Sequence, residues 1–145
     1  HQASELWFKA ILRELHALVD CLAVRDRAAR AAESALWHVQ RLNALMRIVS
    51  AQLTALDTLP PQRFLQFRTY LGSSSGSQSV QFRAIEAASG LRDPHFLQVI
   101  REHGDVPPLV QEALARPTLQ ELFLGLVEAE GTTPEALYVG PGPTA

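Results

Sequence analysis

Two long stretches near the start of the sequence repeat apolar residues at intervals of three and four, and this repeat constrains the fold most. The first stretch, from Gln2 to Ala23, contains Trp7, Ile11, Leu15, Leu18 and Leu22. The second stretch follows a charged run at 25–27, reaches about residue 59, and contains Val39, Leu42, Met46, Val49, Leu53 and Leu56. This spacing places apolar side chains on one face of an α-helix, and its persistence over several turns is typical of a helical bundle. The sequence therefore predicts two long amphipathic helices.

Prolines, glycines and capping residues divide the rest of the sequence into shorter helices. Pro60 and Pro61 end the second long helix, and we expect further helices at 61–71, 80–89, 94–101 and 119–127. Gly90 closes the helix at 80–89, and Thr118 with Glu121 forms a capping box. No stretch alternates apolar and polar residues as a half-buried strand does, so the predicted fold class is all-α. We expect one helical domain over residues 1–139, with a last turn near 133, and a disordered Pro/Gly-rich tail at 140–145.

Composition argues against several classes of function. The net charge is −2 and the twelve Arg are scattered, so no positive field would gather nucleic acid. No apolar run reaches the roughly 20 residues that a membrane-spanning helix needs, and the start does not resemble a signal peptide, so we expect a cytoplasmic protein. The single cysteine, Cys21, rules out an internal disulfide, and no two of the five histidines share a helical i,i+3 or i,i+4 spacing. A local metal site is therefore not predicted.

Arg68 is the most informative single residue, because it lies between Phe64 and Leu71 on an otherwise apolar helical face. A guanidinium in that position needs an anion, since a buried unpaired charge costs several kcal/mol. The anion is either a protein carboxylate or a ligand carboxylate held by two parallel hydrogen bonds, unless the guanidinium reaches water. The next segment, Gly72 to Gly76, is either a cradle for a polar ligand or a flexible connector, and it lacks the Gly-Lys-Ser/Thr ending of a phosphate loop.

Three segments, taken together, resemble the tryptophan 2,3-dioxygenase family. They are HQASELWFK at 1–9, FLQFRTYL at 64–71 and SGSQSVQFRAIE at 75–86. The similarity rests on their order and separation and extends over residues 1–130. It implies an all-α bundle of the tryptophan/indoleamine dioxygenase type that binds haem b and is a homotetramer or dimer. It also implies an oxidoreductase of the kynurenine pathway that inserts O2 into the indole ring of L-tryptophan and yields N-formylkynurenine.

The resemblance also implies roles for individual residues. His1 matches a catalytic histidine that binds the indole N–H, and Arg68 matches the arginine that holds the substrate carboxylate. Phe64, Phe67 and Leu71 match residues that form the walls of the indole pocket. Ser75 and Gly76 match a loop that lies over both substrate and haem. Leu53 stands where many members have a haem-contacting tryptophan.

Some family features have no counterpart in this chain. No residue matches the haem-ligating histidine of the family's C-terminal helix, so the chain is expected to be incomplete and inactive by itself, with no metal ligand. Leu53 and Ser77 depart from the usual aromatic residues, which is compatible with a homologue acting on a modified tryptophan. Two alternatives stay open: a haem-less helical module that binds an aromatic amino acid, and a divergent haem mono-oxygenase on a related aromatic substrate.

Overall fold

The computed structural model describes residues 2–24, 29–70, 79–92, 98 and 105–133. Within these ranges every regular element is an α-helix, so the all-α prediction is confirmed. The helices are α1 (Gln2–Ala23), α2 (Ala29–Asp57), α3 (Pro61–Tyr70), α4 (Val80–Ser89), α6 (Pro108–Ala115) and α7 (Leu119–Ala129). None of these described helices is both long and apolar enough to span a membrane.

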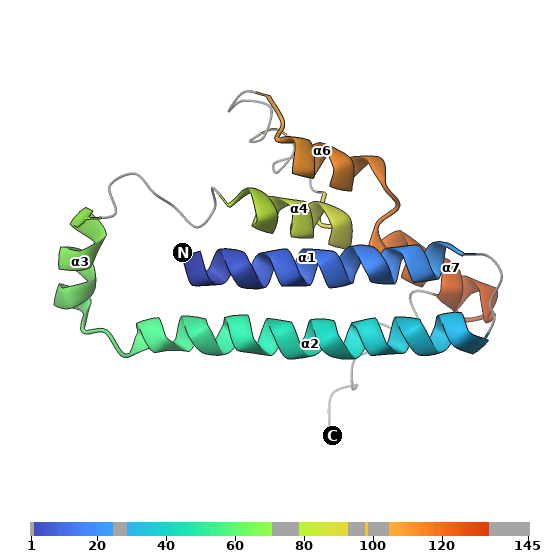
Figure 1. Cartoon of the computed structure of the whole chain (residues 1–145), viewed down its shortest axis with the longest axis horizontal. Coiled ribbons are helices and arrows are strands. Elements are labelled where there is room, and N and C mark those ends of the chain that lie inside the picture. The colour runs from blue at the N-terminus through green and yellow to red at the C-terminus, as the bar shows by residue number, and fades with distance from the viewer. Residues whose placement is uncertain (1, 25–28, 71–78, 93–97, 99–104, 134–145) are drawn as a thin grey trace, which may run out of the picture.

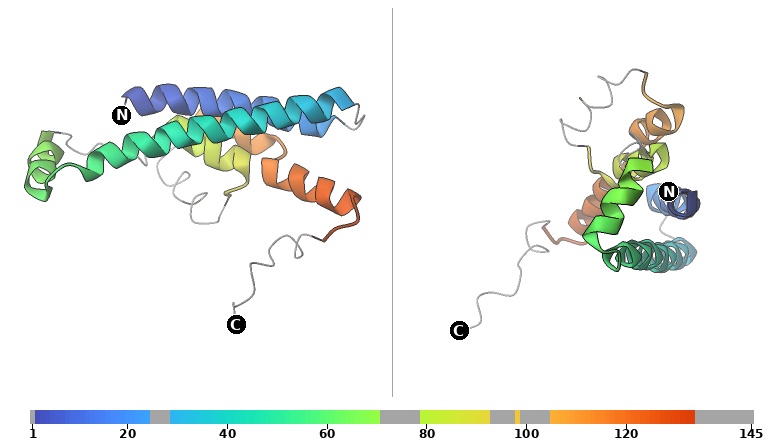
Figure 2. Two further views of the ribbon diagram at one scale, coloured as in Figure 1. Left: turned by 90° about the horizontal axis from the view of Figure 1, so that it is seen from below. Right: turned by 90° about the vertical axis from the view of Figure 1, so that its left-hand side faces the viewer.

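Helix α1 is the centre of the arrangement. It runs antiparallel to α2 along most of its length, and α4 lies on its other side (Figure 1). Helix α6 packs on α4, and α7 contacts both α1 and α4 (Figure 2). Helix α3 stands apart at the far end of α2 and packs against none of the other described helices. The two long N-terminal helices and the shorter ones after them agree with the sequence-based prediction.

The core forms where α1, α4 and α6 meet. Leu12 and Leu15 of α1 are buried against Ala84 and Ala87 of α4, both of which are completely inaccessible to solvent. Small alanine side chains let the two helices approach closely, so that the branched side chains of α1 fill the space between them. Val110 and Ala113 of α6 belong to the same buried cluster.

Local signals read from the sequence act as predicted at the helix ends. Gly90 ends α4 in the left-handed conformation, with φ of +114°. Thr118 and Glu121 form the capping box of α7: the backbone N–H of Thr118 donates to the Glu121 carboxylate at 2.8 Å, and the Glu121 N–H donates to the Thr118 hydroxyl at 3.0 Å. Arg92 then joins α4 to α6, because its guanidinium donates to the backbone oxygens of Ala87 and Ala113, each at 2.8 Å.

The apolar stripe predicted on α2 is divided by the structure. Leu42 packs against the core, whereas Val39, Met46 and Leu53 are 39%, 49% and 55% exposed. Among the α2 side chains that the structure describes, Ala35 and Leu45 are buried, each 8% exposed, and Leu45 is one position before Met46. Helix α2 therefore packs on α1 with a seam that shares Leu42 with the predicted stripe but leaves out Met46 and Leu53, and a second apolar surface stays uncovered in the described part of the chain.

Several predicted segments fall outside the described residues. They are the loop at 73–77, the helix at 94–101 except residue 98, the part of the last turn that follows residue 133, and the tail at 140–145.

Candidate functional site

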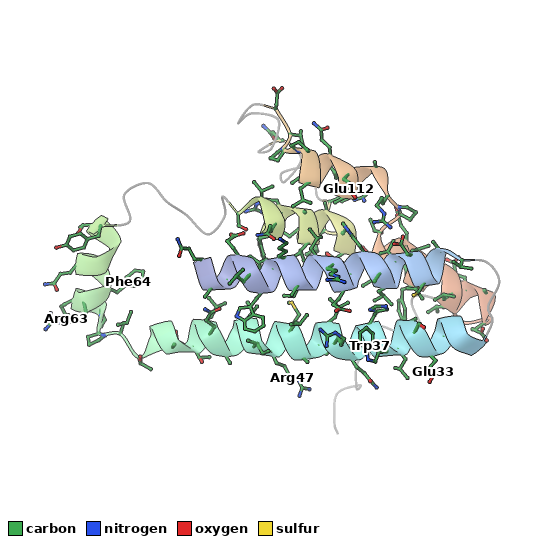
Figure 3. The ribbon with its side chains drawn as sticks, in the orientation of Figure 1. Glu33, Trp37, Arg47, Arg63, Phe64 and Glu112 are labelled. Carbon is green, nitrogen blue, oxygen red and sulfur yellow. The ribbon has the colours of Figure 1, made fainter. Side chains whose placement is uncertain are left out.

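The helix that carries Arg68 begins at a proline turn. The backbone N–H groups of Arg63 and Phe64 both donate to the carbonyl of Pro60, at 2.9 and 3.0 Å, which starts α3. Phe64 points toward the side where α1 begins, and Arg63 points away from it (Figure 3). The Phe64 ring is 43% exposed. The structure therefore presents an aromatic side chain on the inner side of α3.

Other predicted site residues are described only in part or not at all. Phe67 and Arg68 belong to α3, but their side chains lie outside the described part of the structure. The remaining residues of the predicted site that lie outside the described residues are His1, Leu71, Ser75 and Gly76. Their roles stay predictions, and what the structure adds is the position of the helices to which they are joined.

The first turns of α1 and α4 are held side by side. The side-chain amide of Gln81 donates to both the backbone oxygen and the carboxylate of Glu5, at 3.1 and 2.7 Å. One turn along α1, the Phe8 ring packs against Phe82 with a centroid separation of 5.3 Å. Sequence reasoning did not predict the contact between Gln81 and Glu5, although both residues lie within the motifs that carry the resemblance.

The described surface fits one part of what a haem would need. Leu53 and Met46 present apolar side chains on α2 that are 55% and 49% exposed, and a porphyrin is bound mainly through apolar contact. Among the described residues, no three His, Cys, Asp or Glu side chains are grouped to hold a metal ion. The two exposed apolar side chains therefore suit the wall of a haem site.

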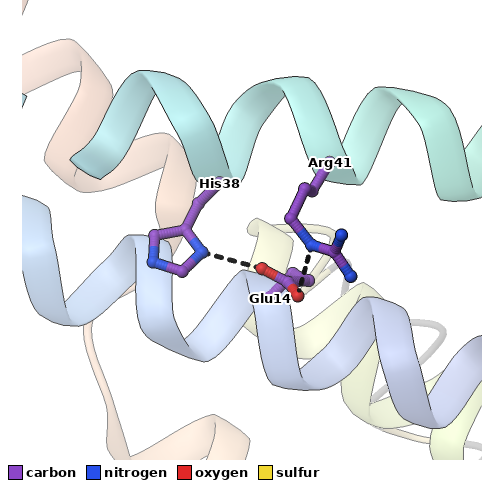
Figure 4. A network of polar contacts seen from close by, with 3 residues as sticks. All are labelled: Glu14, His38 and Arg41. Atoms are coloured by element: carbon purple, nitrogen blue, oxygen red, sulfur yellow. Dashed lines mark hydrogen bonds and ion pairs between the residues drawn. The ribbon is translucent and has the colours of Figure 1, made fainter. Parts of the chain in front are cut away.

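A charged network joins α1 to α2 and was not predicted. Nδ1 of His38 donates to one carboxylate oxygen of Glu14 at 2.7 Å, and Nε of Arg41 donates to the other at 2.8 Å (Figure 4). Burial raises the pKa of the Glu14 carboxyl, but the hydrogen bonds from His38 and Arg41 and the charge of Arg41 outweigh it, so the pKa lies below its ordinary value. Arg41 also lies over the Trp37 ring, 5.0 Å from its centroid. The network fixes the pairing of the two long helices, and nothing about it suggests catalysis.

Two further polar features have structural explanations. Arg83 and Glu86 form an i,i+3 ion pair on α4, at 2.7 Å. His16 lines an open pocket of about 400 Å³ between α1 and α6, together with Lys9, Arg13 and Glu112. Its Nε2 atom is buried without a hydrogen-bond partner, and burial followed by the nearby charge of Arg116 lowers its pKa. The pocket lies along the middle of α1, and side chains of both charge signs line it.

Comparison with known proteins gives one consistent match. The sequence profile described as Tryptophan 2,3-dioxygenase matches residues 1–129. A relative of that name from a Nocardioides strain is 37% identical, over 90% of this chain and 49% of the relative. The Kineococcus radiotolerans protein of the same name is 38% identical, over 86% and 42%. The one from Caulobacter vibrioides is 34% identical, over 94% and 50%. The chain thus spans about half the length of the curated relatives it matches.

Proposed function

Because the chain belongs to the tryptophan 2,3-dioxygenase family, we propose that it forms the substrate-binding half of a haem-dependent dioxygenase that acts on L-tryptophan or a modified tryptophan. The observation that carries the proposal is the family match, which extends over residues 1–129 and so includes all three motif segments. The proposed reaction adds one atom of O2 to each of the indole carbons C2 and C3 and breaks the bond between them, which yields a product of the N-formylkynurenine type.

Arg68 is the proposed anchor for the substrate. Its guanidinium can hold the amino-acid carboxylate through two parallel hydrogen bonds, which fixes the direction as well as the position of the ligand. Phe64, Phe67 and Leu71 belong to the same helical segment and are proposed to wall the indole ring. Phe64 supports this assignment, because it is half-exposed and points to the inner side of α3 (Figure 3).

His1 is the proposed partner of the indole N–H. It directly precedes α1, whose first turn is held against α4, and α4 follows the segment that contains Ser75 and Gly76. We propose that these two residues and Leu53 border the haem. When bound, haem b would supply the activation of O2. The residues of this chain would orient the indole, hold its N–H and keep water from the pocket, which together lower the entropic cost of reaction.

The exposed apolar residues of α2 support a larger assembly. Leu36 and Trp37, which are not among the residues proposed to border the haem, are 58% and 52% exposed, and exposed apolar surface is often covered by other protein. We propose a homotetramer or homodimer of the natural-length protein. Its location in the cytoplasm stays a prediction from the sequence.

Replacement of Arg68 tests the proposal. In the natural-length protein loaded with haem, we expect Arg68→Ala to raise the KM for L-tryptophan about 100-fold, because truncating one partner of a hydrogen-bonded charge pair costs about 2–5 kcal/mol. The haem absorption band should be unchanged. Binding of tryptamine, which has no carboxylate, should be the same in both proteins.

Arg63→Ala is the matched control, because Arg63 lies on the same helix and points away from the side that Phe64 faces (Figure 3). It should leave the KM for L-tryptophan unchanged. If Arg68→Ala behaves like Arg63→Ala, Arg68 does not bind substrate. If the wild-type protein binds no haem even after reconstitution with hemin, the haem-less binding module becomes the better assignment.

A further inference from the structure

The contact between Glu5 and Gln81 joins two helix beginnings that are 76 positions apart in the sequence. One side-chain amide serves two acceptors, the backbone oxygen of Glu5 at 3.1 Å and its carboxylate at 2.7 Å. Both side chains are half-buried, so the contact is partly shielded from water. The ring pair of Phe8 and Phe82 lies beside it and closes the same junction.

The position of this contact within α1 matters for the helix end. The first turn of a helix has unpaired N–H groups and opens more readily than the middle. The carbonyls of residues 2–5 accept from the N–H groups of residues 6–9, and Gln81 adds a bond to the last of these carbonyls. Gln81 therefore holds the first turn of α1 in its helical position from outside.

The same contact fixes the start of α4. Ser79 caps this helix, because its hydroxyl accepts from the backbone N–H of Phe82 at 3.1 Å, and Ser79 is only 8% exposed. Gln81 stands in the first turn after that cap. A displacement of the first turn of α1 would thus change its position relative to the start of α4, where the preceding chain segment ends.

We propose that Gln81 and Glu5 are positioning residues for substrate binding: they hold the helix start next to His1 in register with the helix start next to the segment of Ser75 and Gly76. The inference rests on the proposed function. It predicts that loss of the contact weakens the interaction that His1 makes with the indole N–H. The carboxylate interaction of Arg68 is carried by α3, which has no contact with α1 or α4 among the described residues, and it should be unaffected.

The test compares two ligands that differ in the indole N–H. In the natural-length, haem-loaded protein, Gln81→Met keeps the size and helix preference of the side chain but removes the donor. We expect the Kd for L-tryptophan to rise about five-fold, as for the loss of one hydrogen bond, while the Kd for 1-methyl-L-tryptophan changes less than about two-fold. Hydrogen exchange of the backbone amides of residues 6–9 should accelerate.

Charge variants separate hydrogen bonding from packing. Gln81→Glu places a second carboxylate against Glu5, so it should weaken L-tryptophan binding more than Gln81→Met, although the side chains have similar size. The exchange of both residues, Glu5→Gln with Gln81→Glu, restores one donor and one acceptor and should recover part of the loss. Gln111→Met is the control for the substitution itself, because the exposed Gln111 side chain donates to the backbone oxygen of Val106 at 2.8 Å, in a contact that does not involve α1.

Each outcome decides between the alternatives. Equal changes for both ligands, or no change, would overturn the positioning role even if amide exchange at residues 6–9 accelerates, and the contact would then be structural only. Failure of the proposed function would be seen in the wild-type protein, which would bind neither ligand, and the inference would fail with it.

Discussion

Replacement of Glu14 by Gln isolates the network between α1 and α2. The Glu14 side chain is 12% exposed and accepts charged hydrogen bonds from His38 at 2.7 Å and from Arg41 at 2.8 Å. A glutamine has one acceptor oxygen, so its amide N–H group must face one of the two donors. Hydrogen bonds to charged groups contribute about 1.5–3 kcal/mol, and Arg41 is 48% exposed, which reduces its share. We therefore expect a loss of about 2 kcal/mol at pH 7, measured by urea denaturation of the natural-length protein.

The stability difference between wild type and Glu14→Gln should also depend on pH. The pKa of Glu14 lies below its ordinary value of 4.5, so the stabilisation is complete above that value and is lost as the pH falls through the folded pKa. The difference between wild type and Glu14→Gln should therefore shrink when denaturation is repeated at about pH 3. Glu33→Gln is the matched control, because Glu33 is exposed on α2. A pH-independent difference, or a loss equal to that of Glu33→Gln, would refute the argument.

Two predictions concern the helix ends. A Cβ on Gly90, whose φ is +114°, would lie 2.7 Å from Oε1 and 2.8 Å from Cβ of Gln120, so Gly90→Ala should cost about 1–3 kcal/mol by urea denaturation. An unchanged midpoint would show that this turn is not rigid. Thr118→Ala removes the hydroxyl of the α7 capping box and should cost about 1 kcal/mol. The pKa of Glu121, lowered first by the Thr118 N–H and then by its hydroxyl, should rise in an NMR titration but stay below normal, and a full return would mean the remaining backbone bond was also lost.

The features that could be predicted from sequence are those controlled by neighbouring residues. Helix α1 has the predicted bounds, Gln2–Ala23, because one apolar face continues without a helix breaker. Helix α4 ends at Gly90 because the left-handed conformation there strongly favours glycine. The Thr118 capping box likewise depends on residues three positions apart.

The packing of α2 could not be predicted, since periodicity does not say which of two adjacent apolar stripes is covered. Ala35, Leu42 and Leu45 form the seam on α1, with His38 between them. Glu14 lies at the corresponding place on α1, between buried Ile11 and Leu18. The sequence signal for the network was one polar residue within each apolar seam, His38 on α2 and Glu14 on α1. This signal predicts a contact only when the two seams are known to face each other.

For the candidate site, the sequence motifs carry more information than the described part of the structure. Arg68 was singled out by its place among apolar residues, and the structure places it on a described helix without describing its side chain. Gln81 and Glu5 were missed because a glutamine and a glutamate at helix starts are common on surfaces. Only the fold shows that one reaches the other.

The 29-residue length of α2 also determines the direction in which α3 faces. At 1.5 Å per residue it spans about 43 Å, and each residue turns the helix by about 100°. Helix α3 follows α2 across a proline turn and packs against none of the other described helices. The direction that α3 faces therefore depends on the number of residues in α2. One residue inserted into α2 would swing Phe64 by about 100° away from the start of α1, whereas seven would nearly restore its heading about 10 Å farther out. The number of residues between Ala29 and Pro61 therefore sets both the distance of α3 from the start of α2 and the direction that α3 faces.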